Sequence, residues 1–274
     1  MIPTLSQVCT LNSPFEADVR DFAAGRCAAI EFWMTKLEAY LEKTSPAAVR
    51  KLLDASGIVA PVASYQGGIL DSTGDRRREA WELFRSRLAI CQELSVPTLV
   101  VAADIQEKLD TGVLRRVTDS LAEAAVLADQ YDVRVALEFQ AGATFVNNVQ
   151  TTVALIEQVN HTHLGICLDL FHYWNGPSKF EDLQLISREK LFHVQLSDLA
   201  DVPRELARDA QRILPGEGDL PVSSIVGWLR AMGYDGPVSV ELMNPLLWQV
   251  PALQFGEIGV TALRQVLGLA GGAA

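Results

Sequence analysis

Short apolar runs and longer amphipathic segments alternate along nearly the whole chain. The runs are rich in Val, Ile, Leu and Ala, and the segments between them repeat apolar residues every three or four positions. This is the pattern of a strand followed by a helix. Eight runs are expected as strands: Thr4–Cys9, Ala28–Phe32, Ile58–Ser64, Thr98–Ala103, Val133–Glu138, Leu164–Asp169, Leu191–Leu196 and Pro237–Leu242.

The helical segments are long enough to cross between parallel strands. They include Asp75–Leu94 and Gly112–Tyr131, the second with a clear apolar stripe. Eight strand–helix units in 274 residues predict one closed (β/α)8 TIM barrel of the α/β class. We expect a single domain over residues 1–270, with 271–274 as a tail. A doubly wound open sheet is the alternative, but the sequence has no G-x-G-x-x-G motif and no P-loop.

Charge and composition exclude several classes of partner. The chain has 34 acidic and 23 basic residues, a formal charge of −11. This disfavours nucleic acid and anionic membranes, which are bound chiefly by Lys and Arg. No apolar stretch reaches the length of a membrane span, and the first residues lack the pattern of an export signal, so a cytoplasmic protein is expected. The four scattered cysteines form no C-x-x-C pair and are expected as reduced core residues.

Four polar residues end four consecutive expected strands: Glu138, Asp169, Gln195 and Glu241. In a barrel, the carboxyl ends of the strands carry the active site. Three carboxylates gathered there would repel one another unless a cation neutralised them or their pKa values rose, and a metal is the simpler solution. Oxygen donors suit Mg²⁺, Mn²⁺ or Co²⁺ better than Zn²⁺, so one such divalent cation is predicted. The alternative is that each residue is simply a solvated strand end.

Histidines follow or precede these strand ends. His172 comes three residues after Asp169, the position of a general acid or base, although it can also simply pack against aromatic neighbours. His193 lies two residues before Gln195 and is expected as a support for the site or a ligand. His161 and His163 precede a strand, at the opposite end of the barrel, and are interpreted as structural.

Arginines follow the seventh expected strand. Arg208 and Arg212 are four residues apart, so on a helical turn they can clamp a carboxylate or a phosphate of the substrate. Equally, they can form a solvated pair with Glu205 and Asp209 on an exposed helix.

Further substrate-binding candidates lie after other expected strands. Glu217 lies in a glycine-flanked turn and either reaches the substrate or, together with Asp219, caps the next helix. Glu31 and Trp33 lie at the end of the second strand, and Gln66 follows the third. Trp33 can form a wall against the apolar face of a sugar or fill a gap between loops.

Several motifs between Val133 and Glu241 resemble one known family. They are ALEF, GICLDLFHYW, HVQLSD, LPGEGDL and GPVSVEL. Together they are similar to the xylose-isomerase-like TIM barrels, the sugar phosphate isomerase/epimerase superfamily. The resemblance implies one divalent cation held at Glu138, Asp169, position 195 and Glu241, with the two glutamates as proton-transfer groups.

The residue at position 195 bears on the branch of this family. Many epimerases of the group have His there, whereas H-x-Q resembles the hydroxypyruvate isomerase and 3-dehydroshikimate dehydratase branches. The long arginine-containing segment after Asp198 also looks more like the dehydratases. A related zinc endonuclease is disfavoured, because it needs several more histidines and this chain has four in all.

The resemblance implies a metal-dependent isomerase or epimerase of a sugar or related hydroxy-carbonyl compound. It would remove the proton next to the carbonyl and form a metal-bound enediolate. One alternative is a lyase like 3-dehydroshikimate dehydratase, which eliminates water, and another is a barrel that binds a sugar without catalysis. The apolar segment from Trp248 to Gly259 can close the site or form a subunit contact, so a homo-oligomer is one expectation.

Overall fold

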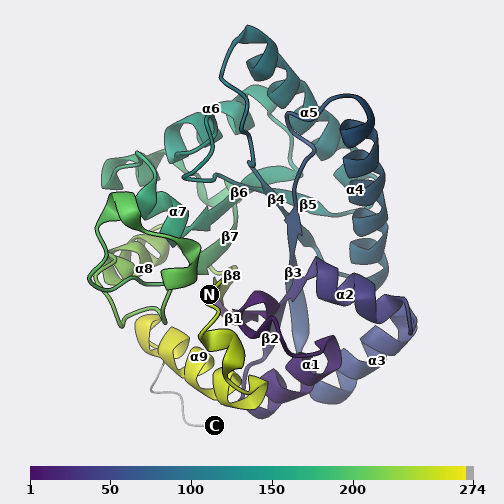
Figure 1. Cartoon of the computed structure of the whole chain (residues 1–274), viewed down its shortest axis with the longest axis vertical. Coiled ribbons are helices and arrows are strands. Elements are labelled where there is room, and N and C mark those ends of the chain that lie inside the picture. The colour runs from purple at the N-terminus through teal and green to yellow at the C-terminus, as the bar shows by residue number, and fades with distance from the viewer. Residues whose placement is uncertain (270–274) are drawn as a thin grey trace. The chain divides into compact units, whose positions relative to one another are not determined.

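The computed structural model describes residues 1–269 and contains the eight expected strands in parallel order. Their hydrogen-bonded order is β1 to β8, closing on itself with β8 beside β1 (Figure 1). This confirms the (β/α)8 class. The strands are β1 (Ile2–Ser6), β2 (Ala29–Trp33), β3 (Val59–Gln66), β4 (Thr98–Ala102), β5 (Arg134–Glu138), β6 (Leu164–Asp169), β7 (Leu191–Leu196) and β8 (Pro237–Val240).

Most strands end within two residues of their predicted ends, but the first strand differs more. β1 stops at Ser6, and Gln7–Thr10 form a 3-10 helix, η1. The ammonium group of Lys36 binds the carbonyl oxygens of Gln7 at 3.3 Å and of Thr10 at 2.6 Å. Because these carbonyls bind a side chain, the apolar run that was expected to continue the strand turns away instead.

Helices follow the strands as the crossover pattern predicts. They are α1 (Phe15–Ala24), α2 (Met34–Leu41), α3 (Pro46–Ser56), α4 (Gly74–Leu94), α5 (Thr111–Asp129), α6 (Val149–Val159), α7 (Leu170–Asn175), α8 (Val222–Ala231) and α9 (Ala252–Val266). Short 3-10 helices occupy the connections: η2 (Phe180–Leu185), η3 (Arg188–Lys190), η4 (Arg204–Leu206), η5 (Asp209–Gln211) and η6 (Leu247–Gln249). In residues 1–269, no helix is long and apolar enough to cross a membrane.

Side-chain caps fix where several of these helices begin. Ser45, Asp110 and Asn148 each accept a hydrogen bond from the backbone N–H three residues later. Such a cap stabilises a helix by about 1 kcal/mol, because it pairs an N–H group that has no partner inside the helix.

The chain divides into two compact units, which we describe separately. Of the described residues, the first consists of Met1–Pro61 together with residues 194–269. In it, Leu5 of β1 pairs with Ile30 of β2 and with Val240 of β8. Helices α1 and α9 lie side by side (Figure 1). Gly25, just after α1, allows this approach, since a Cβ there would lie 2.8 Å from the backbone of Gly256.

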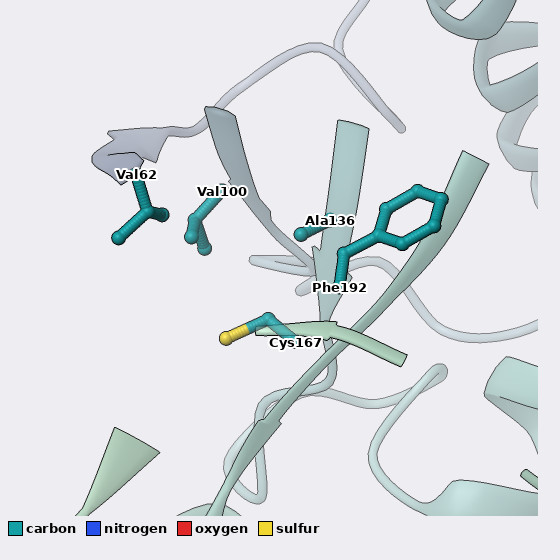
Figure 2. Packing of buried hydrophobic residues seen from close by; sticks show 5 residues of the cluster. All are labelled: Val62, Val100, Ala136, Cys167 and Phe192. Atoms are coloured by element: carbon teal, nitrogen blue, oxygen red, sulfur yellow. The ribbon is translucent and has the colours of Figure 1, made fainter. Parts of the chain in front are cut away.

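The second unit, Val62–His193, contains β4, β5, β6 and most of β3. One buried layer takes Val62, Val100, Ala136 and Cys167 from these four successive strands, with Phe192 of β7 beside them (Figure 2). All four cysteines are buried free thiols, as predicted. The polar residues Glu138 and Asp169 end β5 and β6, so the layer supports two adjacent strands that both finish on a carboxylate.

Candidate active site

Two carboxylates and a histidine gather where β5 and β6 end. Glu138, Asp169 and His172 are buried, and each offers a donor atom within 4.8 Å of the others. Asp169 Oδ1 accepts a hydrogen bond from the backbone N–H of His172 at 3.1 Å, so it also caps α7. The sequence predicts these three residues near one another, and the structure brings them together within the second unit.

Neighbouring groups orient the glutamate and the imidazole. Gln140 Nε2 donates to Glu138 Oε2 at 2.7 Å. The backbone N–H of Ala141 faces His172 Nδ1 at 3.5 Å, and His172 Nε2 lies 4.0 Å from Glu138 Oε1. An imidazole nitrogen that accepts a hydrogen bond carries no proton, so in the neutral ring the proton belongs on Nε2, which faces Glu138. His172 Nε2 therefore faces the glutamate, at a distance longer than a hydrogen bond.

A second group of buried polar side chains lies in the first unit. Gln195 Nε2 donates to Glu31 Oε1 and to Glu241 Oε1, both at 2.9 Å. Glu31 is fully buried within β2, and Glu241 directly follows β8. A single neutral amide therefore bridges two carboxylates. Of the residues predicted at the strand ends, the structure brings Gln195 and Glu241 together, with Glu31 beside them.

Arg212 joins this second group, whereas Arg208 does not. Arg212 is 1% exposed and its Nη1 donates to Glu241 Oε2 at 3.1 Å. Its Nε and Nη2 both donate to Asp209 Oδ1, at 3.0 and 2.7 Å. Arg208 is exposed. The expected single helical turn is absent, because Arg204–Leu206 and Asp209–Gln211 form two separate 3-10 turns.

The predicted helix cap by Glu217 and Asp219 is wrong. Pro221 is the residue before α8, and no side chain caps this helix. Glu217 is exposed, and Asp219 instead accepts a hydrogen bond from the backbone N–H of Asp201. The turn is organised by Asp198, whose carboxylate accepts from three backbone N–H groups, including those of Gly216 and Leu220.

The remaining predicted residues lie on or beside strand ends. Gln66 is buried at the end of β3, where Arg87 of α4 donates to its oxygen at 3.4 Å. The backbone N–H of Trp33 donates to Gln7 Oε1, and its side chain is half-buried. His193 is fully buried in β7. The substrate-binding roles of these residues remain predictions from the sequence.

Other ionisable groups with altered pKa values lie next to strand ends. Burial raises the pKa of Asp104, which accepts a hydrogen bond from the N–H of Gly68. Burial also raises the pKa of the Cys9 thiol, and the negative charges of Glu241 and Glu31 add to this effect. Cys9 is therefore a neutral thiol that donates to the carbonyl oxygen of Val240.

Two contributors to the site escaped the sequence analysis. Gln140 supports Glu138, and Asp209 was considered only as a surface partner of the arginines. Gln140 could have been predicted as a polar residue two positions after a strand end. For the second, the spacing of three residues between Asp209 and Arg212 suits an ion pair, but nothing in it indicates that the arginine is buried.

Comparison with protein families gives a match over most of the chain. The model described as "Xylose isomerase-like TIM barrel" matches residues 23–256. An inosose isomerase of Halalkalibacterium halodurans is 30% identical over 172 residues, which are 62% of this chain and 61% of that protein. A 3-dehydroshikimate dehydratase of Pseudomonas putida is 26% identical over 271 residues, 96% of this chain but 40% of that protein. The matched stretch thus spans less than two thirds of either relative.

Solved structures agree on the fold. The crystal structure of an IolI protein with a bound zinc atom superposes with a TM-score of 0.91 at 23% identity, covering 98% of both chains. A D-psicose 3-epimerase of Clostridium cellulolyticum, solved with D-tagatose, gives a TM-score of 0.79 at 19% identity, covering 97% of this chain and 99% of that one. From the family match and the shared barrel, we conclude that the chain belongs to the xylose isomerase-like TIM barrel family.

Proposed function

We propose that this chain is a divalent-metal-dependent isomerase or epimerase of a polyhydroxylated ketone or related hydroxy-carbonyl compound. The observation that carries the proposal is the buried group of Glu138, Asp169 and His172 at the ends of β5 and β6. Two acidic side chains buried together are costly unless a positive charge compensates them. A group of this kind at a barrel's strand ends is a usual place for catalysis.

The donor atoms present fit a divalent cation. Glu138 and Asp169 supply carboxylate oxygen ligands, which suit Mg²⁺ or Mn²⁺. When bound, such an ion would polarise the substrate carbonyl and stabilise negative charge on its oxygen. Gln195 and Glu241 remain predicted ligands on the evidence of the sequence.

Glu138 is the proposed group that removes the proton beside the carbonyl. Its carboxylate is held on one oxygen by Gln140, at 2.7 Å, and approached on the other by His172 Nε2, at 4.0 Å. A base fixed in this way needs little reorganisation before it accepts a proton. His172, with its proton on Nε2, is suited to donate a hydrogen bond to a substrate oxygen.

Glu241 is the proposed group that returns the proton. Each of its carboxylate oxygens accepts a hydrogen bond, from Gln195 Nε2 at 2.9 Å and from Arg212 Nη1 at 3.1 Å. These donors hold the carboxylate in one orientation. Two carboxylates with different neighbours match the different demands of taking and giving a proton.

Relatives support the substrate class. The inosose isomerases are named for reactions on hydroxy-ketones, and so is a D-psicose 3-epimerase of Enterocloster bolteae that is 24% identical over 136 residues. A dehydratase is the second candidate, because the match to 3-dehydroshikimate dehydratase runs over 96% of this chain. Both reactions begin with the loss of a proton next to a carbonyl, and they differ only in whether a proton returns or water leaves.

The test measures metal content and proton exchange together. Purified protein is analysed for bound metal, loaded in turn with Mg²⁺, Mn²⁺, Co²⁺ and Zn²⁺, and incubated in D₂O with inososes, ketohexoses, hydroxypyruvate and 3-dehydroshikimate. Deuterium entering a compound of otherwise unchanged composition is the expected result. Loss of water with new ultraviolet absorbance would identify the dehydratase instead.

Variants separate binding of the metal from chemistry. Asp169→Asn is expected to lower metal content, because it removes a charged donor from the buried group. In protein loaded to the metal content of the wild type, Glu138→Gln is expected to lower exchange by about a hundredfold or more, the contribution of a positioned base. Glu107→Gln, at an exposed carboxylate paired with Arg116, is the control. Absence of exchange with every compound and metal would contradict the proposal and favour a barrel that binds sugars without catalysis.

A further inference from the structure

Arg212 is buried, although residues 203–211 before it are exposed or half-buried. Its backbone is fixed on both sides, because Asn244 Nδ2 donates to its carbonyl oxygen at 3.0 Å and the next residue, Ile213, pairs with Asp198. A buried guanidinium is costly unless carboxylates compensate its charge. Asp209 and Glu241 provide this compensation, at 2.7 and 3.1 Å.

The two carboxylates contact different sides of the guanidinium. A single oxygen of Asp209 accepts from both Nε and Nη2, which fixes the plane of the group. Nη1 then donates to Glu241. If Asp209 lost its charge, its bonds to Nε and Nη2 would weaken, and the donor that Arg212 offers to Glu241 would be oriented less firmly.

Glu241 in turn is one member of a continuous chain of contacts in the first unit. The chain runs from Asp209 through Arg212, Glu241 and Gln195 to Glu31, and every link is a hydrogen bond or ion pair of 2.7 to 3.1 Å. Asp209 is its most exposed member, with 45% of its side chain accessible, while Arg212 and Glu241 are buried. A substitution at Asp209 therefore disturbs the chain from its outer end without creating a cavity.

We propose that Asp209 is a positioning residue for Glu241: it orients Arg212, and Arg212 holds the glutamate carboxylate. This proposal rests on the proposed function, in which Glu241 returns the proton to the substrate. It assigns Arg212 a task within the protein, in addition to any contact it makes with substrate. It also explains why a half-exposed aspartate lies three residues before a buried arginine.

Two measurements on Asp209→Asn test the proposal. With a compound that exchanges in D₂O, kcat is expected to fall by about tenfold to a hundredfold, as for a slightly misplaced catalytic group, with KM within about twofold. Asp209→Glu keeps the charge and is expected to restore much of kcat. Asp201→Asn, an exposed aspartate of the same segment, is the matched control.

The second measurement needs no substrate. The carboxyl ¹³C signal of Glu241 is observed in protein labelled at glutamate and identified by its loss in Glu241→Gln. It is expected to shift and broaden in Asp209→Asn but not in Asp201→Asn. An unchanged signal would overturn the positioning role even if the enzyme is active, and so would a fall in kcat that Asp209→Glu does not reverse. A shifted signal in a protein that exchanges nothing would instead leave positioning intact and contradict the proposed function.

Discussion

The side-chain amide of Gln195 uses one nitrogen atom for two carboxylates. Nε2 donates to Glu31 and Glu241, each at 2.9 Å. Its oxygen is the atom that a cation would bind, so bridging the two acids and holding a metal are separate roles of one side chain. The position of Gln195 at a strand end indicates the metal-binding role. The bridging role depends on the contact with Glu31, which no spacing along the chain reveals.

Removing the amide tests the bridging role. In metal-free protein, Gln195→Ala is expected to lower the free energy of unfolding by about 2 kcal/mol, because two buried carboxylates each lose a donor. Urea unfolding in the presence of a chelator measures this. Gln92→Ala, at an exposed position of α4, is the control and is expected to change little. A Gln195→Ala protein as stable as the control would mean that the bridge carries no net stabilisation.

At the level of elements, the strands were more predictable than the connections. Buried strands such as Leu164–Asp169 and Leu191–Leu196 have the predicted bounds, because continuous apolar runs are required where both faces of a parallel sheet are covered. The segment after β7 was not predictable in this way. Its 3-10 turns show no helical periodicity in the sequence, and the residue after the second turn, Arg212, is held through its carbonyl by the distant Asn244.

The candidate site also has features that were predictable from the sequence and features that were not. The residues that end strands, Glu138, Asp169, Gln195 and Glu241, were predictable because the barrel rule assigns function to strand ends. Contacts between side chains were predictable only where the residues are neighbours in sequence, such as Asp169 and His172. The pairing of Arg212 with Glu241 joins residues 29 positions apart, and the sequence alone left two readings of that arginine equal.

Asp198 fixes both ends of the segment that follows β7. Its Oδ1 accepts from the N–H groups of Leu199 and Leu220, and its Oδ2 from that of Gly216, all at 2.8 to 2.9 Å. Asp198→Ala removes these three hydrogen bonds and is expected to lower the free energy of unfolding by about 3 kcal/mol.

The same substitution is expected to loosen the segment locally. Proteolysis under native conditions should cut within residues 199–220 faster in Asp198→Ala than in the wild type. Asp219→Asn is the control, because that exposed side chain accepts one hydrogen bond from the same turn. Equal cleavage rates in the two variants would show that the turn is held by its backbone contacts alone.

For the whole molecule, one buried ion pair links stability to pH. Asp18 of α1 is fully buried and lies 2.6 Å from the ammonium group of Lys36, and it also accepts from Thr10 and Gln7. Burial raises the pKa of Asp18 from 3.8 to about 6, although Lys36 opposes this rise. Burial likewise lowers the pKa of Lys36. The pair joins η1, α1 and α2, so its protonation state affects packing near the ends of β1 and β2.

The sign of the pH dependence follows from that pKa. Between pH 3.8 and about 6, the folded protein holds a proton on Asp18 that the unfolded chain has released. The stabilisation from this group is therefore complete below pH 3.8 and is lost as the pH rises through about 6. At about 1.4 kcal/mol per pKa unit, the loss is at most about 3 kcal/mol.

The substitution Asp18→Asn removes this titration. The free energy of unfolding of the variant, minus that of the wild type, should therefore increase from pH 4 to pH 6. Urea unfolding of metal-free protein at several pH values measures the difference, with Asp21→Asn, a half-buried position on the same helix, as the control. A difference that stays constant, or that changes in the opposite direction, would show that Lys36 keeps Asp18 ionised at these pH values.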